Sequence, residues 1–188
     1  RYYGVIPENT DLPKRQRSAE PPQTAERRVL LRDTRVAQPY VSRSYLATER
    51  NSGDQHMAAA LTLLADLLGG GTTSYLTEKL QFETQKAVYT SAFYGGVSLD
   101  DATFSVVVVP TVDVSLEEAE DAMDATLAQF LVDGVDEDRL ARIKYQLRAS
   151  EIYGRDNVDG IANRYGRALA SGLTIEDVQS WPEVLQAV

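Results

Sequence analysis

The sequence predicts an α+β domain in which a mostly antiparallel sheet is covered by helices. Three observations lead to this fold class. Two short segments with strand composition come first, two more follow a stretch of helical periodicity, and the second half of the chain has helical periodicity almost throughout. Strands and helices that are grouped in this way, without regular alternation, are typical of α+β folds.

The first 25 residues have a different composition from the rest of the chain. They contain four prolines, and Lys14, Arg15 and Arg17 lie among them. Proline disfavours helix and charge keeps a segment solvated, so this composition indicates an extended connector. We expect residues 1–25 to be the end of a preceding domain and its linker, and residues 26–188 to be one domain. This domain is expected to be truncated at its C-terminus, because no finishing strand follows the last helix.

Two strands are predicted before the first helix. Residues 28–32 are short and apolar at their centre, and residues 39–46 are rich in aromatic and β-branched side chains. In the second of these segments, Val41, Arg43 and Tyr45 share one face, because successive side chains of a strand alternate between faces.

A long, heavily buried helix is expected next. Ser52 and Gln55 have the spacing of a capping box, so the helix is predicted to begin near Gly53. Its predicted buried face consists of Met57, Ala60, Leu61, Leu64 and Leu68, widened by Leu63 and Leu67.

This helix runs into Gly69, Gly70 and Gly71, and Thr72, Thr73 and Ser74 follow directly. Glycine can leave a helix in a left-handed conformation, and a hydroxyl can accept an amide hydrogen at the start of the next helix. We interpret this stretch as a structural corner between two helices. A phosphate-binding loop is the alternative, but the lysine of a P-loop and the glycine spacing of a dinucleotide site are missing.

After the helix that follows the corner, two strands and four further helices are predicted. The strands cover residues 87–94 and 102–109, and the second is apolar on both faces, so it should be central or lie at a domain contact. Ser115 and Glu118 form a second capping box for a helix that Gly134 ends. The next helix is expected at 137–153, with Leu140, Ile143 and Leu147 facing inward, and another at 158–170. A last, short helix is expected to begin at Thr174 and to be interrupted by Trp181-Pro182.

Composition excludes several classes of function. The net charge of −9 opposes nonspecific nucleic-acid binding, and no apolar run is long enough to span a membrane. The chain has no cysteine and a single histidine, His56, so it cannot form a thiolate metal site or a site with two of its own histidines. Nothing in it indicates a compartment.

Three other groups of residues contain side chains that could form a site. His56 stands alone near a helix start, where a surface or packing role is the simpler interpretation. The acidic residues between 117 and 124 lack the spacing of a calcium loop, so a solvated helix face explains them better. Ser42 and Ser44 have no nearby base that could make either of them a nucleophile.

Four pieces of sequence, in this order, resemble the pitrilysin or insulinase-like zinc metallopeptidases. They are RYYGVIP at 1–7, the proline-rich basic linker, QPY at 38–40 and LGGGTTSYL at 68–76. The similarity extends over nearly all of the chain, and the glycine corner with the hairpin after it is its most specific piece. The chain resembles the second half, which does not bind zinc, of one of the shorter bacterial members.

The resemblance implies one half of a clam-shell that encloses a peptide-binding chamber. In this family, the first half binds zinc through an inverted His-x-x-Glu-His motif and a further glutamate, and the motif's glutamate acts as the general base. That motif is absent here. No residue of this chain is therefore expected to be catalytic or to bind metal, and zinc is expected in the parent protein outside this fragment. The implied partners are a peptide or small unfolded protein, the N-terminal zinc-bearing domain and a second subunit, in a homodimer or heterodimer.

The family's second half often contributes an arginine and a tyrosine seven residues apart, which bind substrate and stabilise the oxyanion. Gln81 and Val88 occupy the matching positions here, and neither side chain can do that work. Tyr89 is one residue away and is expected on the opposite face of its strand. Either the parent is the zinc-bearing member of a pair of different subunits, whose partner supplies these two residues, or it is a non-catalytic relative with a structural role.

Overall fold

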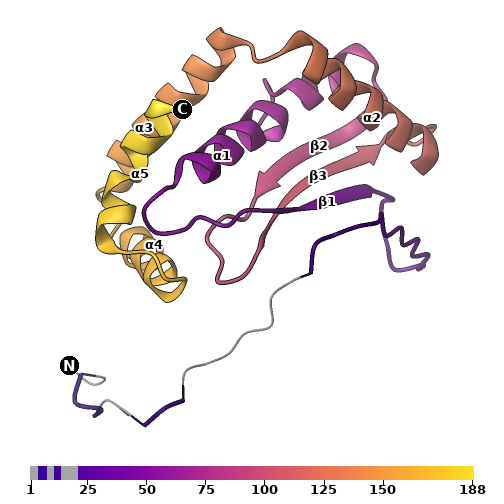
Figure 1. Cartoon of the computed structure of the whole chain (residues 1–188). Coiled ribbons are helices and arrows are strands. Elements are labelled where there is room, and N and C mark those ends of the chain that lie inside the picture. Colours follow the sequence, from indigo (N-terminus) through magenta and orange to yellow (C-terminus); the bar gives the residue numbers. More distant parts are fainter. Residues whose placement is uncertain (1–3, 8–10, 14–20) are drawn as a thin grey trace.

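A three-stranded antiparallel sheet forms the centre of the fold. The structure, a computed structural model, describes residues 4–7, 11–13 and 21–188, so the start of RYYGVIP and the basic residues of the linker lie outside the described residues. The strands are β1 (Val41–Ala47), β2 (Ala87–Tyr94) and β3 (Ala102–Pro110), in the order β1-β3-β2. Helices cover the sheet (Figure 1), which confirms the α+β fold class.

The central position of β3 was predicted from its sequence and is confirmed. Both neighbouring strands are antiparallel to β3. Val108 of β3 lies opposite Val41 of β1 on one side and opposite Thr90 of β2 on the other. Val106 and Val108 are each only 1% exposed, and they face a core formed with helices. Val107 and Val109, on the other face, are half-buried.

The predicted strand at 28–32 is wrong. These residues have no regular secondary structure, and Val29, Leu30 and Leu31 are 89%, 64% and 78% exposed. A strand needs a neighbour for its backbone hydrogen bonds, and within the described chain no segment pairs with this one. The next strand begins at Val41, two residues later than predicted.

The first helix, α1 (His56–Gly69), begins later than predicted, and only part of its predicted face is buried: the burial of Leu63, Leu67 and Leu68 is confirmed. Its buried residues are Ala58, Ala59, Leu63, Ala65, Leu67 and Leu68. Met57 is 58% exposed, and Leu61 and Leu64 are only partly buried. The helix packs on two sides, because Ala65 and Leu68 join the core on the sheet while Ala59 and Leu63 join a second core against α5 (Ile175–Ala187).

The predicted Ser52–Gln55 capping box does not form, because Gln55 has other partners. Gln55 is the N-cap residue but makes no side-chain cap. Its side chain accepts a hydrogen bond from the Arg50 guanidinium and lies 3.4 Å from the Asp177 carbonyl oxygen. Arg50 also donates to that carbonyl at 2.7 Å and lies over Trp181, 3.8 Å from its ring centroid. This buried cluster fastens the start of α1 to α5.

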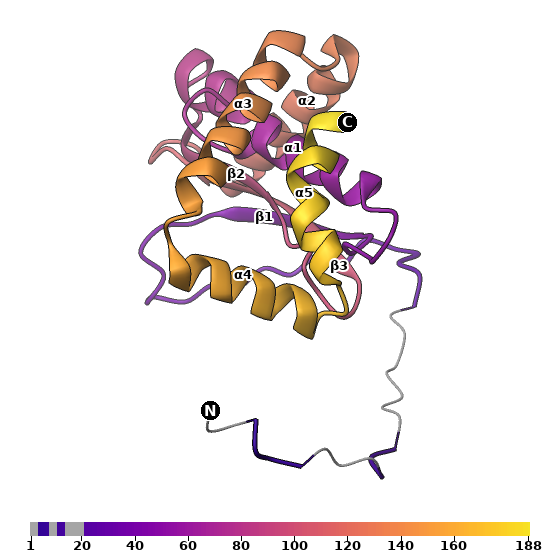
Figure 2. The same ribbon diagram turned by 90° about the vertical axis from the view of Figure 1, so that its left-hand side faces the viewer.

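Four helices follow β3 (Figure 2): α2 (Leu116–Asp133), α3 (Glu137–Gly154), α4 (Val158–Ala170) and α5. The capping box predicted from Ser115 and Glu118 is confirmed, with both of its hydrogen bonds present. Helix α5 continues through Pro182, so the predicted interruption is wrong. Trp181, Val184 and Leu185 pack on both sides of the proline, and this burial offsets the lost backbone hydrogen bond. In the described part of the chain, no helix is long and apolar enough to cross a membrane.

Candidate functional site

The glycine corner brings α1 against β2. A Cβ atom on Gly69 would lie 1.9 Å from the Ala92 backbone nitrogen, so only glycine allows this close approach. Gly71 has a φ of 149°, which residues with a side chain rarely adopt, and Gly70 is the C-cap residue of α1. Thr72 is exposed at the turn. The stretch thus contains one glycine for contact with the sheet and another for the change in chain direction.

The corner leads into η1 (Thr77–Glu83), a π-helix where an ordinary helix was expected. The predicted hydroxyl cap is wrong, since no side chain caps this helix. Ser74 instead donates its hydroxyl hydrogen to the Gly71 carbonyl at 2.7 Å. This hydrogen bond joins the two ends of the turn 71–74.

Tyr75 anchors the corner to α2. Its hydroxyl donates to Asp133 at 2.7 Å, and its ring packs edge-on against Phe130 with the centroids 5.1 Å apart. Burial, together with the hydrogen bond to Asp133, raises the pKa of Tyr75 to about 12. The same hydrogen bond lowers the pKa of Asp133. The phenol is therefore held neutral as a structural donor and is not poised for proton transfer.

A buried chain of hydroxyls joins the corner to β2. Ser74, Thr77 and Thr90 are each 4% exposed. The Ser74 and Thr77 hydroxyls lie 2.9 Å apart, and the Thr77 and Thr90 hydroxyls 3.0 Å apart. Gln81 lies at the end of this chain, 2.9 Å from the Thr90 hydroxyl.

Gln81 closes the outer edge of β2. With its amide oriented so that both ends find partners, its oxygen accepts from the Thr90 backbone N–H at 3.0 Å and its nitrogen donates to the Val88 carbonyl at 3.3 Å. A neighbouring strand would use these same two backbone groups of β2. The Gln81 side chain therefore takes the place of a strand residue at this edge.

Val88 lies in a bulge of β2. The register passes from Ala87 opposite Pro110 to Tyr89 opposite Val109, so Val88 has no partner residue on β3. Val88 and Tyr89 are 50% and 53% exposed. The structure thus places Gln81 and Val88 together at one edge, and neither side chain supplies a charge or a phenolic donor there.

A polar cavity of about 220 Å³ lies beside the corner. Its lining includes Asp66, Gly71 and Arg139. Burial raises the pKa of Asp66, and the guanidinium of Arg139 is paired with Glu78. The Asp66 carboxyl in the wall repels a phosphate, and Glu78 offsets the charge of Arg139, although the Nε and Nη1 atoms of Arg139 have no hydrogen-bond partner. The two carboxylates therefore do not favour the phosphate-loop alternative.

The sheet face opposite the helices carries half-exposed apolar side chains. Tyr89 lies opposite Val109 in the register, so these two share that face, as do Phe93 and Val107. Phe93 is 50% exposed. Ser44 lies on the same face, where its hydroxyl is 2.8 Å from that of Ser105 and so has a partner that cannot act as a base.

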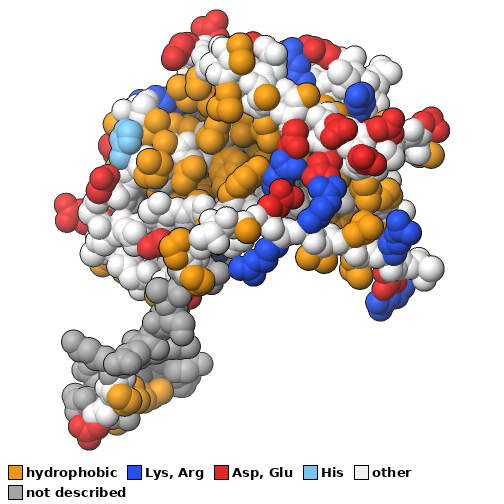
Figure 3. Space-filling model, turned by 45° about the vertical axis from the view of Figure 1, so that its right-hand side comes forward, with side chains coloured by type: hydrophobic (Ala, Val, Ile, Leu, Met, Phe, Trp, Pro, Cys, Tyr) orange, Lys and Arg blue, Asp and Glu red, His pale blue; other side chains and the backbone are white. Residues whose placement is uncertain are grey.

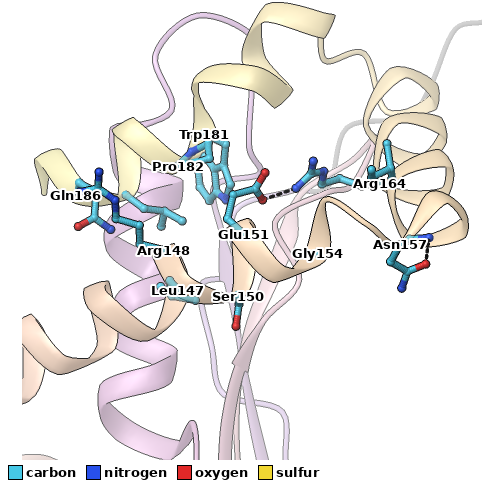
Figure 4. Close-up of a pocket in the computed structure, with 13 residues that line it drawn as sticks. Leu147, Arg148, Ser150, Glu151, Gly154, Asn157, Arg164, Trp181, Pro182 and Gln186 are labelled. Carbon is cyan, nitrogen blue, oxygen red and sulfur yellow. Dashed lines mark hydrogen bonds and ion pairs between the residues drawn. The ribbon is translucent and has the colours of Figure 1, made fainter.

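A second cavity, of about 340 Å³, lies between α3, α4 and α5 (Figure 4). Leu147, Ile161 and Trp181 are among its apolar lining residues. Glu151 and Arg164 point toward one another beside Trp181 and form an ion pair. Because these two charges neutralise one another, the cavity offers apolar contact and no free acid–base pair.

The other candidates have structural partners. His56 is exposed at the first position of α1, where its backbone amide donates to Asp54 at 3.0 Å. Of the acidic residues in α2, Glu120 accepts from Arg28 and Arg43, and Asp124 accepts from Arg43. The described residues contain no cluster of three or more histidines, cysteines or carboxylates that could hold a metal.

Sequence reasoning missed the partners of Gln81. Thr77 and Thr90 were not singled out, although each places a hydroxyl at a buried position of its helix or strand. Thr77 and Gln81 are four residues apart and so lie on one side of their helix, which was a usable signal. The contact with Thr90 depends on tertiary packing and has no local signal.

Comparison with known proteins gives a family and a fold. The family described as "Peptidase M16 inactive domain" matches residues 1–147. No curated protein matches. A crystal structure of a protease from Helicobacter pylori superposes with a TM-score of 0.74 at 17% identity, covering 83% of this chain and 37% of that chain.

Two shorter structures match as well. The "inactive peptidase domain of a putative zinc protease" from Bordetella parapertussis gives a TM-score of 0.70 at 16% identity, with 85% of this chain and 82% of that chain covered. A "putative zinc protease" from Bordetella pertussis gives 0.68 at 17% identity, with 81% of each chain covered. At these identities the superpositions show a shared fold.

Proposed function

The chain belongs to the peptidase M16 inactive-domain family, and from this premise we propose that it is the non-catalytic C-terminal domain of a zinc-dependent metalloendopeptidase. In this proposal, residues 1–25 connect it to the zinc-bearing domain, and residues 26–188 form part of the wall of a peptide-binding chamber and of a subunit interface. Zinc and the general base belong to the parent protein outside this chain.

The observation that carries the proposal is the uncovered sheet face within a domain of this family. Tyr89 and Phe93 are half-exposed there beside the valines of β3. Aromatic groups next to aliphatic and hydroxyl groups suit an unfolded peptide, because they bury its apolar side chains and still hydrogen-bond its backbone. A chamber wall needs such a face.

Gln81 and Val88 favour a paired-subunit form of the enzyme. They stand where the resemblance places a substrate-binding arginine and tyrosine, and both ends of the Gln81 amide are hydrogen-bonded, to Val88 and to Thr90. A partner subunit would supply the missing donors. The same two residues also suit the second candidate, a structural or assembly subunit that is related to the peptidases but has no activity.

Metal analysis and peptide cleavage by the full-length parent separate these two functions. The parent is assayed alone and with the product of any paired gene, and the 188-residue chain serves as the control. We expect zinc in the parent, cleavage only when the partner is present, and neither zinc nor cleavage with this chain alone. A parent that binds no zinc and cleaves nothing in either mixture supports the structural role instead.

A variant of the sheet face tests the chamber wall directly. Replacing Phe93 with Ser in the active mixture removes an exposed ring while leaving the core face of β2 intact. We expect KM for an apolar peptide to rise several-fold, by about 1 kcal/mol of lost contact, with little change in kcat. The matched control is Leu131→Ser, which changes an 82% exposed side chain on α2. Equal KM values for the two variants would contradict a role of this face in peptide binding.

A further inference from the structure

The cavity of about 220 Å³ beside the glycine corner contains charges of both signs. Asp66, from α1, and Arg139, from α3, both line it. Charged side chains of both signs also lie side by side on the open surface, as Figure 3 shows, but there water surrounds and screens them. In a cavity, less water competes with a ligand for the same two groups.

Arg139 has hydrogen-bond donors without acceptors. Its side chain is only 13% exposed, and its Nη2 atom pairs with Glu78. The Nε and Nη1 atoms are buried without a partner, and in the described part of the chain no other buried side-chain atom lacks one. Buried polar groups almost always have partners, so these two donors favour any acceptor that they can reach. Because both atoms are covered, the guanidinium has to turn slightly about its contact with Glu78 to present them to the cavity.

Asp66 lacks a donor in the same cavity. Its side chain is half-buried, and no residue of the described chain pairs with its carboxylate or donates a hydrogen bond to it. Burial raises the pKa of Asp66, which means that the surroundings disfavour its charge. A cation beside this carboxylate would remove that penalty.

The rest of the site limits the charge and size of a ligand. The two carboxylates of Asp66 and Glu78 and the single guanidinium of Arg139 give a net charge of −1, so a ligand with one positive charge leaves the site neutral. Ile143 and Leu147 add apolar, half-buried surface to the wall. The volume is below the roughly 300–1,000 Å³ of pockets that hold drug-sized ligands, so the ligand is small.

We propose that this cavity binds an apolar α-aminoacyl group, in which an ammonium and a neutral carbonyl flank one carbon that carries an apolar side chain. The ammonium pairs with Asp66, and the carbonyl oxygen accepts from Arg139. The apolar side chain contacts Ile143 and Leu147. An amino acid amide and the first residue of a peptide both carry this group. The cavity lies between the end of α1, the corner and α3, away from the uncovered sheet face, so this binding does not depend on peptidase activity.

Calorimetric titration of the full-length parent with leucinamide tests the site. N-acetyl-leucinamide lacks the ammonium and isopentylamine lacks the carbonyl, and each should bind about tenfold more weakly or worse. Free leucine should also bind more weakly than leucinamide, because its carboxylate is repelled by Asp66 and Glu78. Leucyl-glycinamide distinguishes the two sources of the group, since it binds as tightly as leucinamide only if the cavity admits a peptide end.

Two substitutions locate the binding. Asp66→Asn should weaken leucinamide about tenfold and leave N-acetyl-leucinamide unchanged, because only the first ligand has an ammonium. Arg139→Lys keeps a cation beside Glu78 but loses the donor fork, so it should weaken leucinamide and leave isopentylamine unchanged. The matched control is Asp121→Asn, which removes the same charge from an exposed position on α2 and should change neither affinity.

Three results would overturn the proposal. Absence of leucinamide binding to the folded parent would mean that water alone fills the cavity. Binding that survives Asp66→Asn unchanged would place the ligand elsewhere, for example at a peptidase centre. Tighter binding of free leucine or of N-acetyl-leucinamide would contradict the pairing of the ammonium with Asp66 beside a neutral carbonyl. A urea midpoint for each variant shows that it is folded, and none of these results depends on the zinc and cleavage assays.

Discussion

Replacing Gln81 with Leu should destabilise the domain by about 1–3 kcal/mol, because it leaves the backbone amide of the buried Thr90 without its partner. Three hydrogen bonds are lost, to the Val88 carbonyl, the Thr90 amide and the Thr90 hydroxyl. Thr90 is 4% exposed, so water replaces these bonds poorly. The volume of the side chain is nearly unchanged, so little of the loss comes from packing.

Urea unfolding gives the magnitude, and hydrogen exchange gives the place. We expect a lower midpoint at an unchanged slope, and faster exchange of the Thr90 amide by roughly tenfold or more. The matched control is Gln146→Leu, an exposed glutamine on α3, which should change stability by less than about 0.5 kcal/mol. If Gln81→Leu behaves like this control and the Thr90 amide is unaffected, Gln81 does not close the edge of β2.

Three further predictions concern the corner and the α1–α5 contact. Gly69→Ala should cost more than about 3 kcal/mol in thermal unfolding, since its Cβ would overlap the β2 backbone, whereas Gly95→Ala, in open space, should be tolerated. Arg50→Met should lower the free energy of unfolding in urea by about 2–4 kcal/mol, because the buried Gln55 side-chain oxygen and Asp177 carbonyl lose their donor and Trp181 loses the guanidinium over its ring. An unchanged midpoint would exclude this role. The amide and hydroxyl of Thr174 lower the pKa of Asp177 below its ordinary 3.8, so stability should fall as pH drops through and below about 4, and Asp177→Asn should flatten this acid limb in pH-dependent urea titrations.

Elements whose signals are local were predictable from the sequence. The capping box of Ser115 and Glu118 closes within three residues, so its pattern was sufficient. Ser52 and Gln55 carry the same pattern, but the Gln55 side chain is drawn to Asp177, 122 residues away, and the box does not form. Residues 28–32 have the composition of a strand but pair with no other segment of the described chain, and composition alone could not show this because β-pairing is a property of two segments.

The site shows the same division between local and distant signals. The resemblance identified Gln81 and Val88 as altered positions, and the sequence could explain only what they cannot do. Their arrangement depends on the hydroxyls of Thr77 and Thr90, which meet across a π-helix and a bulged strand. Neither irregularity has a periodicity that a sequence pattern could reveal.

Gln81 makes contacts at the β2 edge that an arginine could not make. An amide donates and accepts at once, which allows it to bind both Val88 and Thr90, whereas a guanidinium donates only and would leave the Thr90 amide unpaired. An arginine here would have to leave the β2 edge, and the freed side chain could then reach toward a substrate. The residue that removes the charge is thus also the residue that closes the edge.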